Sequence, residues 1–485
     1  MSLKIYNSQS RQIEEFSPLT PGQVKMYVCG PTVYNFLHVG NFRGVVFFNL
    51  VRHWLEFSGY KVTYALNFTD VDDKIIVRAR EMGVSPQELT ERYIEEYKKD
   101  FASLGLRPHE VNPKVTDHMD EIVSMVRTLV EKQKAYESQG DVLYSIETFA
   151  EYGKLSGRHT EELYAGARVE VDDKKRNPLD FALWKAAKPG EVAWPSPWGP
   201  GRPGWHIECS AMIHKIFGEQ IDIHGGGMDL LFPHHENEIA QSEGCSGKHF
   251  VKYWMHNNML NLGGQKMSKS LGNIVTLREF IQINHPEIYK WMVLSVHYRT
   301  LSDFSEAAVD RAVSGLARVY SALALAESYL PLGSESVAEE AGLAKVTAEA
   351  WDKVEKAFNN DFATPEAFAT LFEVVRQFNS QVRHGMKSNL AIQGKALAFR
   401  SFIRKCGSFM SLFQEPAQQF LLKLDDMLLQ KMNVERGQVD ELVAQRSQAR
   451  ANKDFAKSDE LRDHLAAMGI SVSDTPQGSH WEVTK

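Results

Sequence analysis

The chain has 485 residues, and its 55 Lys and Arg against 62 Asp and Glu give a formal net charge of −7. At roughly 150 residues per domain, this length predicts about three domains. Hydrophobic residues make up 43% and charged residues 24%, a composition that excludes extensive disorder and a fibrous chain. The acidic balance argues against unspecific nucleic-acid binding, so a nucleic-acid partner would have to meet a local basic surface.

Cysteine usage and the N-terminal segment bear on the compartment. The four cysteines are too few and too scattered for a disulfide scaffold: Cys29, Cys209, Cys245 and Cys406. Isolated cysteines in a large chain indicate a reducing compartment, expected here to be the cytoplasm, and point to metal binding or catalysis. Residues 1–20 carry early charges and lack an apolar core, which argues against a secretory signal. No stretch approaches ~20 apolar residues, so we expect no membrane span.

The first third of the chain alternates strand and helix patterns, at residues 26–29, 41–58, 62–66 and 72–81. Gly59 and Gly83 stand where helix-ending glycines are expected, and Ser85-Pro86 begins a further helix. Strands separated by helices pair in parallel, which predicts an α/β fold with a Rossmann-like doubly wound parallel sheet. The ligand of such a sheet lies beyond the carboxyl ends of its strands. Cys29 ends the first predicted strand and therefore stands at that site.

The pattern changes after about residue 110. Residues 116–136 predict one amphipathic helix, and residues 141–147 predict a strand. Residues 194–205 hold four prolines, three glycines and three tryptophans, so this segment is neither a helix nor a central strand. We therefore predict an insertion, at about 110–200, that interrupts the nucleotide-binding sheet.

A linker pattern at residues 330–336 is followed by helical patterns to about residue 430, and the tail predicts a pair of helices and a hairpin. The expected fold is thus the doubly wound sheet with its insertion, followed by an α-helical bundle and a small C-terminal α+β module. The predicted domain limits are 1–315, 316–430 and 431–485.

Residue types that bind metals cluster at Cys209 and in the run His234-His235-Glu236-Asn237-Glu238. His234 and Glu238 are four residues apart, so on a helix they share one face and can approach one ion. The run is not the HExxH pattern, because no histidine stands at position 239. A thiolate with an imidazole and a carboxylate suits Zn²⁺ best. A solvated helix start is the alternative, and the spacing alone does not decide between the two.

Two further segments have the pattern of nucleotide-binding loops. Residues 31–41 link a strand to a helix N-terminus, which offers free N–H groups to phosphate. Gly40 lets the backbone approach closely, and His38 can donate to phosphate. Downstream, Lys266 and Lys269 lie on a glycine-flanked loop from which both can reach a triphosphate. A solvated charged loop is the alternative for that segment.

These two segments, His38-Val39-Gly40-Asn41 and Lys266-Met267-Ser268-Lys269-Ser270, resemble the HIGH and KMSKS signatures of class I aminoacyl-tRNA synthetases. Four longer segments are similar to cysteinyl-tRNA synthetases: CGPTVYNFLHVGN, GWHIECSAM, DIHGGGMDLLFPHHENEIAQSE and KMSKSLGN. The tail from ARANKDF onward is similar to the end of the family's anticodon domain, so the resemblance covers essentially the whole chain. It departs at Asn41, where the signature has histidine. Asparagine keeps an N–H donor but carries no proton charge.

The resemblance implies a ligase that activates L-cysteine with ATP and Mg²⁺ and transfers it to tRNA(Cys). It implies one zinc ion held by Cys29, Cys209, His234 and Glu238, and catalysis by His38, Asn41, Lys266 and Lys269. Nucleotide binding would involve Gly40, Asp229 and Lys269. The amino-acid pocket would be lined by Cys29, Thr69, Trp205 and His224, although His224 is equally consistent with a satisfied core histidine. The family resemblance also implies a monomer.

Zinc accounts for the selection of cysteine over serine, because a thiol is deprotonated on coordination while a hydroxyl stays a poor ligand. A hydrophobic pocket separates such a pair by only ~1–3 kcal/mol. No editing domain is then needed. Four protein ligands usually close a zinc site, whereas a substrate site keeps one position open. We therefore expect a weak Glu238 contact, with expansion to five ligands as the other solution.

Two other functions fit part of the pattern. A mycothiol-type cysteine ligase shares the zinc site and both signatures but adds cysteine to an aminosugar, and it would not need residues 337–430 or the tail. A metal-dependent nucleic-acid-binding protein without catalysis would not need an intact Lys266–Ser270 segment.

The tail has four cations that step by four, three and four residues: Arg446, Arg450, Lys453 and Lys457. If residues 440–467 form one helix, these cations share one face. Such a face, with Trp481 available to stack a splayed base, predicts a contact with the tRNA anticodon. Nearby acidic residues make a solvated charged face the alternative.

Overall fold

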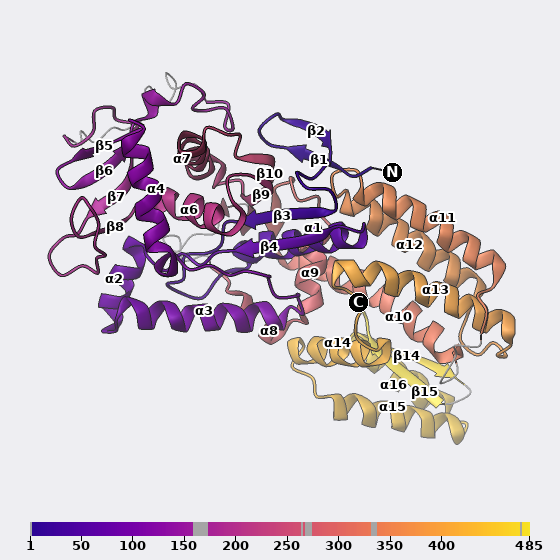
Figure 1. Cartoon of the computed structure of the whole chain (residues 1–485). Helices are drawn as coiled ribbons and strands as arrows, with labels where there is room; N and C mark the ends of the chain where they lie inside the picture. The colour runs from indigo at the N-terminus through magenta and orange to yellow at the C-terminus, as the bar shows by residue number, and fades with distance from the viewer. Residues whose placement is uncertain (1, 159–172, 263–264, 267–273, 331–336, 476–477) are drawn as a thin grey trace.

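The computed structural model describes residues 2–158, 173–262, 265–266, 274–330, 337–475 and 478–485. Its N-terminal part holds the central strands and their helices, a bundle of long helices follows, and the last helices and strands form a small separate module (Figure 1). An antiparallel hairpin of β1 (Lys4–Asn7) and β2 (Gln12–Glu15) precedes the central strands.

A parallel sheet in the order β10-β9-β3-β4 forms the centre of the N-terminal part. Its strands are β3 (Gln23–Val28), β4 (Lys61–Leu66), β9 (Ile221–Gly227) and β10 (Val251–Asn257). The strands predicted at 26–29 and 62–66 are β3 and β4, and their parallel pairing is confirmed. β4 and β9 flank β3 on opposite sides, so the order in which the chain adds parallel strands reverses at β3. A ligand crevice is expected there, at the carboxyl ends of the strands.

Local sequence explains the helices that follow β3 and β4, which are α1 (Val39–Phe57), α2 (Asp73–Met82) and α3 (Pro86–Ser103). Gly83 ends α2 at φ +67°, a left-handed conformation that favours glycine. Ser85 caps α3, because its hydroxyl oxygen accepts a hydrogen bond from the Glu88 N–H at 3.1 Å. Phe42, Val46 and Leu50 on α1 are buried in the core that α1 shares with the sheet.

The segment predicted as an insertion forms an antiparallel sheet of its own, in the order β5-β6-β7-β8. Its elements are β5 (Ala135–Ser138), β6 (Asp141–Tyr144), the 3₁₀ turn η2 (Ile146–Thr148), β7 (Phe181–Ala186) and β8 (Gly201–Pro203). The proline-rich segment contributes β8, which lies at the edge of the sheet, where a missing N–H is tolerated. A second hydrophobic core joins this sheet to α4 (Met119–Glu131) and α6 (Trp205–Phe217).

The helix predicted at 116–136 is shorter than expected. A 3₁₀ turn, η1 (Val115–His118), comes before α4, and α4 ends at Glu131. Gln133 adopts φ +58°, so the helix cannot continue, and the next residues pair with β6 as β5. Strand pairing across the insertion therefore overrides the local helical periodicity.

Between β9 and the bundle, one π-helical turn, η3 (Leu231–His235), leads into α7 (Glu236–Ser246). A small sheet in the order β12-β11-β13 follows β10. Its strands are β11 (Leu260–Leu262), β12 (Gln265–Lys266) and β13 (Ser302–Phe304), and α8 (Leu277–Ile283) and α9 (Pro286–Leu294) come between the last two.

In the described residues from 306 to 431, the regular elements are five helices joined by short connections: α10 (Glu306–Tyr329), α11 (Ala341–Phe358), α12 (Thr364–Gln381), α13 (Leu390–Met410) and α14 (Ala417–Lys431). α10 runs across the predicted limit at residue 316. One continuous core includes Phe48 of α1 and Phe409 of α13. The bundle is therefore packed against the helices of the parallel sheet.

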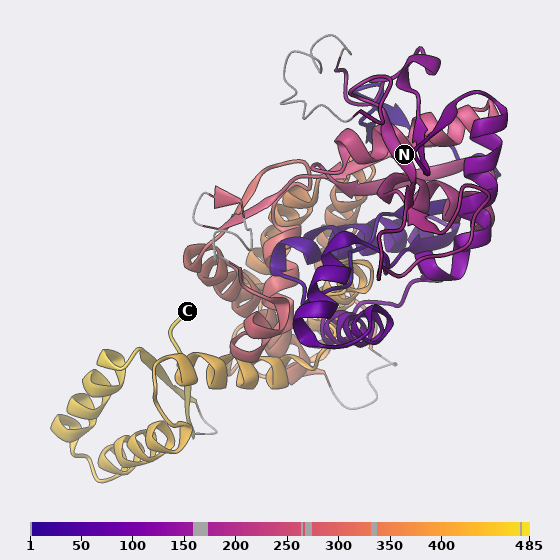
Figure 2. The same ribbon diagram turned by 90° about the vertical axis from the view of Figure 1, so that its left-hand side faces the viewer.

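The C-terminal module consists of α15 (Arg436–Ala451), α16 (Phe455–Ala467) and the antiparallel pair β14 (Ile470–Thr475) and β15 (Gly478–Val483). It has a small core of its own, which includes Val439, Leu465 and Ile470. Figure 2 shows the module projecting away from the rest of the molecule. The predicted helix pair and hairpin are confirmed.

The four cations of the tail share a face only if residues 440–467 form one helix, and this condition is not met. α15 ends at Ala451, and Lys453 at φ +62° turns the chain into α16, so the four cations of the tail do not share a face. Arg446 is 5% exposed and donates two hydrogen bonds, of 2.8 and 2.9 Å, to the Asp474 carboxylate. Arg450 pairs with the same carboxylate. Both arginines thus have the same carboxylate as a partner within the protein.

Trp481 is not exposed for stacking on a tRNA base in this structure. Trp481 is 8% exposed and belongs to the core of the module. Its Nε1–H donates to Asp440 Oδ1 at 2.7 Å, and the Arg436 guanidinium lies 4.6 Å from its ring centroid. The aromatic surface and the polar edge of Trp481 are both used within the module.

Candidate metal and nucleotide site

A cavity of about 600 Å³ opens beyond the carboxyl ends of β3, β4 and β9. Cys29, Cys209 and His234 line it, and His38 and Gly40 connect it to the N-terminus of α1. This is the place that the doubly wound topology predicts for a ligand. One cavity therefore contains both predicted halves of the site, the metal-binding half and the nucleotide-binding half.

Four potential metal ligands from separate elements meet at this cavity, and three of them line it. Cys29 follows β3, Cys209 lies on α6, His234 lies in η3 and Glu238 lies on α7. Their donor atoms all lie within 4.8 Å of one another. The two sulfur atoms are 3.7 Å apart, Cys29 Sγ is 3.4 Å from Glu238 Oε1, and His234 Nε2 is 3.0 Å from the same oxygen.

The electrostatics of this cluster suit a cation. Burial raises the pKa of the Cys29 thiol, whereas the hydrogen bond with Cys29 and the contact with His234 lower the pKa of Cys209 to about 6. Burial would raise the pKa of Glu238, but His224 and His234 bring it down to about 2. The pKa of His234 is about 10, because Glu238 and Cys209 outweigh the opposite effect of burial. A thiolate and a carboxylate thus meet one imidazolium in a buried space, and a divalent cation that replaces the His234 proton would neutralise the two anions.

Histidines surround these ligands in an arrangement that the sequence reasoning did not find. His206 Nδ1 lies 3.0 Å from His234 Nδ1, and His235 Nδ1 lies 2.8 Å from His256 Nε2. Burial lowers the pKa of His206, His235 and His256, which keeps these rings neutral. Neutral imidazoles that hydrogen-bond to ligands typically orient them. The sequence signal that could have identified them is position, because His206 stands inside GWHIECSAM and His235 inside HHENE.

The residues expected to line the amino-acid pocket separate into two groups. Thr69 and Trp205 line the cavity, and the ring of the half-exposed Trp205 lies 4.3 Å from that of His234. His224 does not line it. It is fully buried, stacks on Trp254 and places Nε2 2.8 Å from Glu238 Oε2. His224 therefore contacts Glu238 without lining the cavity.

The nucleotide half is built on the N-terminus of α1 and the end of β9. His38 is the N-cap of α1, and the Asn41 side-chain oxygen accepts a hydrogen bond from the His38 N–H at 3.1 Å. This leaves the Asn41 amide N–H₂ as a donor toward a ligand. Asp229 follows β9 and lines the cavity. A Cβ on Gly227 would lie only 2.5 Å from Asp229 Oδ1, so a larger residue there would displace this carboxylate.

The second signature is described only in part. Lys266 lies in β12, where its backbone pairs with Asn261, and Lys269 lies outside the described residues. The chain that follows returns to the first signature. The Val39 N–H donates to Val275 O at 3.0 Å, and the Leu277 N–H donates to Leu37 O at 3.2 Å. The backbone thus joins the first signature to residues 275–277, which follow the second signature in the sequence.

Comparison with known proteins identifies the family. The model of the tRNA synthetases class I (C) catalytic domain matches residues 15–314, the DALR domain matches 353–414, and the cysteinyl-tRNA ligase anticodon-binding domain matches 436–481. A cysteine–tRNA ligase of Bdellovibrio bacteriovorus is 76% identical over 483 residues, which is 100% of both chains. The chain belongs to the cysteinyl-tRNA synthetase family.

Other members of the cysteinyl-tRNA synthetase family agree in length. Cysteine–tRNA ligases of Geobacter metallireducens and Bacillus pumilus are 46% and 45% identical, and at least 99% of each chain is covered. Among solved structures, methionyl-tRNA synthetase of Mycobacterium tuberculosis in complex with methionyl-adenylate superposes with a TM-score of 0.59 at 14% identity, covering 86% of this chain and 95% of that one. That likeness supports the class I fold alone. Within the described residues, every helix is too short or too polar to cross a membrane.

Proposed function

We propose that the protein is a cysteine–tRNA ligase, which joins L-cysteine to tRNA(Cys) at the expense of ATP. The observation that supports this best is the Cys29–Cys209–His234–Glu238 cluster in the same cavity as the N-terminus of α1. The full-length relatives named cysteine–tRNA ligase agree with it. The mycothiol-type alternative is disfavoured, because the DALR and anticodon-binding models match the regions that such a ligase would not need.

The first step is the activation of cysteine. Its carboxylate oxygen attacks the α-phosphorus of ATP, an acyl–phosphate bond forms, and pyrophosphate leaves with its electron pair. The N–H groups at the start of α1, together with His38 and Asn41, supply donors where charge develops on the phosphate. We assign Lys266 and Lys269 to the leaving pyrophosphate with Mg²⁺, and Gly40 and Asp229 to the adenosine. The tRNA 2′-hydroxyl oxygen then attacks the acyl carbon, the acyl–phosphate bond breaks, and AMP leaves as its phosphate takes up the hydroxyl proton.

The selectivity for cysteine is assigned to zinc. Two sulfurs, one imidazole and one carboxylate within 4.8 Å of one another are a donor set that Zn²⁺ prefers. Bound there, zinc would hold the substrate sulfur as a thiolate, which the hydroxyl of serine cannot match. Glu238 also contacts His224 at 2.8 Å, so this carboxylate keeps a partner if it loosens from the metal. That contact supports a weak Glu238–zinc bond, while Thr69 and Trp205 flank the substrate.

Zinc content and amino-acid activation, measured on the same preparation, test this function. We expect one zinc per chain and ATP–pyrophosphate exchange that depends on cysteine and is undetectable with serine. Exchange with serine at a comparable rate, or full activity in a metal-free preparation, would contradict the assignment. We also propose a monomer in the cytoplasm, and sedimentation of the purified protein tests the oligomeric state.

A further inference from the structure

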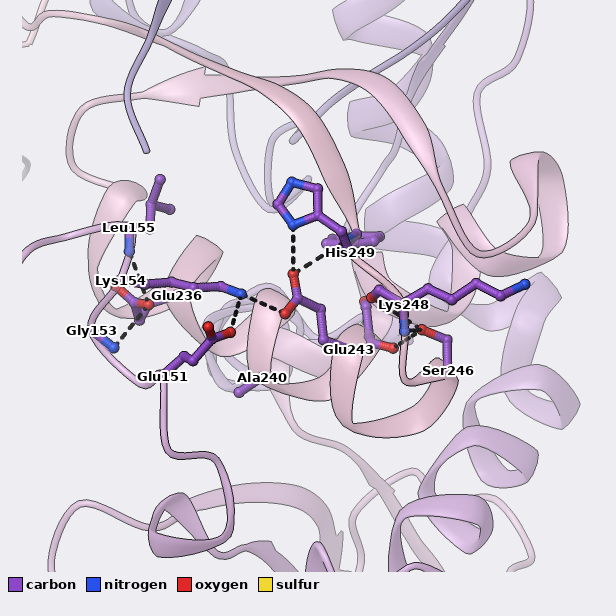
Figure 3. A network of polar contacts seen from close by, with 12 residues as sticks. Glu151, Gly153, Lys154, Leu155, Glu236, Ala240, Glu243, Ser246, Lys248 and His249 are labelled. Carbon is purple, nitrogen blue, oxygen red and sulfur yellow. Dashed lines mark hydrogen bonds and ion pairs between the residues drawn. The ribbon is translucent and has the colours of Figure 1, made fainter. Parts of the chain in front are cut away.

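A turn of the insertion is bound to helix α7 through one buried carboxylate (Figure 3). Glu236 is fully buried, and its carboxylate accepts hydrogen bonds from three backbone N–H groups. The donors are Gly153 at 3.0 Å, Leu155 at 3.3 Å and Ser156 at 2.8 Å. These residues lie about eighty positions from Glu236 in the sequence, so the contact ties two distant segments together.

Glu236 stands midway between the candidate ligands His234 and Glu238. Successive residues of a helix are rotated by about 100°, so a residue two positions away faces nearly the opposite side. The Glu236 side chain therefore points away from the metal cluster and into the insertion, while Glu238 points into the cluster. The insertion therefore supports the helix turn that carries these two ligands, and it does so from the side opposite the metal cluster.

Further contacts hold the same turn against α7 and η3. The Tyr152 hydroxyl donates to Asn237 Oδ1 at 2.6 Å, and Lys154 Nζ lies 2.5 Å from Glu243 Oε2. The Arg158 guanidinium lies 4.6 Å from the ring centroid of Phe232, just before His234. Gly153 adopts φ +98°, and a Cβ there would lie 2.1 Å from Arg158 O, so the turn requires glycine.

We propose that Glu236 is a positioning residue for cysteine recognition, which fixes His234 and Glu238 by fastening α7 to the turn 152–156 of the insertion. This inference rests on the proposed function. A carboxylate matches three converging N–H donors, whereas an amide can accept with only one of its two polar atoms. Residues that orient metal ligands usually change metal affinity or activity about 10–100-fold when they are replaced.

The matched pair Glu236→Gln and Glu243→Gln tests the proposal. Both residues lie on α7 and contact the insertion, but Glu243 is farther from the ligands. For Glu236→Gln we expect the KM for cysteine to rise about tenfold with the KM for ATP unchanged, and Co²⁺ to bind the metal-free protein about tenfold more weakly with an altered visible spectrum. Hydrogen exchange at Gly153, Leu155 and Ser156 should accelerate. Glu243→Gln should leave both Michaelis constants and the Co²⁺ spectrum as in the wild type.

Gly153→Ala disturbs the same contact from the side of the insertion. It replaces Glu236→Gln as the test variant if Glu236→Gln does not fold. It should raise the KM for cysteine in the same direction. The proposal is overturned if either variant changes the constants for cysteine and ATP equally, or if Glu236→Gln and Glu243→Gln behave alike. A wild-type protein without cysteine-dependent exchange would instead contradict the proposed function, and the Co²⁺ and hydrogen-exchange measurements on Glu236→Gln would still decide this inference.

Discussion

The cluster of potential metal ligands and the C-terminal module differ in how their charged side chains are paired. In the cavity, Cys209 and Glu238 have depressed pKa values and face the same space. In the module, Arg446 and Arg450 converge on Asp474, so both cations form ion pairs within the protein. In the cavity cluster two anionic groups face one cationic imidazole, and such a buried excess of one charge is organised for a ligand, whereas the ion pairs of the module stabilise the fold. The following predictions test this contrast, from the largest expected effect to the smallest.

Replacement of a metal ligand should have the largest effect. Cys209→Ser exchanges a thiolate for an alcohol, so we expect loss of bound metal and a fall of more than about 100-fold in cysteine-dependent exchange, beyond the usual range for residues that only orient ligands. Cys245→Ser is the matched control, because Cys245 lies outside the described ligand clusters. Unchanged zinc content in Cys209→Ser would show that the cluster is not the metal site.

Adding a methyl group beside the cavity should cause the second-largest loss of cysteine-dependent exchange. A Cβ on Gly30 would lie 1.7 Å from the backbone oxygen of Asn67, so Gly30→Ala forces apart the loops that follow β3 and β4 and displaces the adjacent Cys29. We expect exchange to fall about tenfold or more. Gly437→Ala meets nothing within 4 Å on α15 and should stabilise the module by about 0.5–1 kcal/mol. Equal effects of the two variants on exchange would refute this difference between the regions.

Substitutions in the C-terminal module should lower the free energy of unfolding and leave cysteine activation unchanged. Arg446→Gln leaves Asp474 without its bidentate partner, and since the Asp474 side chain is 34% exposed we expect a loss of about 2 kcal/mol, below the range for fully buried pairs. Chemical denaturation monitored at Trp481 measures this loss. Lys457→Gln, at an exposed lysine of α16, is the control and should be nearly neutral. Both variants should retain cysteine-dependent exchange, and a defect in exchange for Arg446→Gln would contradict the separation of roles.

The smallest effect concerns acid stability. The hydrogen bonds from Arg446 depress the pKa of Asp474 despite the opposing effect of partial burial. A depressed carboxyl pKa contributes stability that is present above the ordinary aspartate pKa and is lost as the pH falls toward the folded-state pKa. Because the pair is solvent-screened, this contribution is below about 1 kcal/mol. Unfolding of the module at pH 5 and pH 3 should therefore differ more for the wild type than for Asp474→Asn, and equal differences would exclude the linkage.

Motifs and local patterns predicted the strands β3 and β4, the capped start of α3 and the residues that meet in the cavity. These predictions succeeded because each depends on a few neighbouring residues, such as Ser85 capping Glu88 or the four-residue spacing of His234 and Glu238. Boundaries were less predictable. α4 ends early because β5 pairs with β6, and the tail helix breaks at Lys453, where the chain takes a left-handed conformation.

The sequence by itself determined the family, the class of fold and the four candidate ligands, since the type and spacing of motif residues can be recognised without knowing the fold. Only the tertiary structure decided which charges are matched. Arg446 meets Asp474 across 28 positions, and Glu236 meets Gly153 across 83. It also placed His224 behind Glu238 and buried Trp481 in the module. Whether a polar side chain faces a ligand, solvent or a partner depends on segments that packing brings together, and no local pattern records that partner.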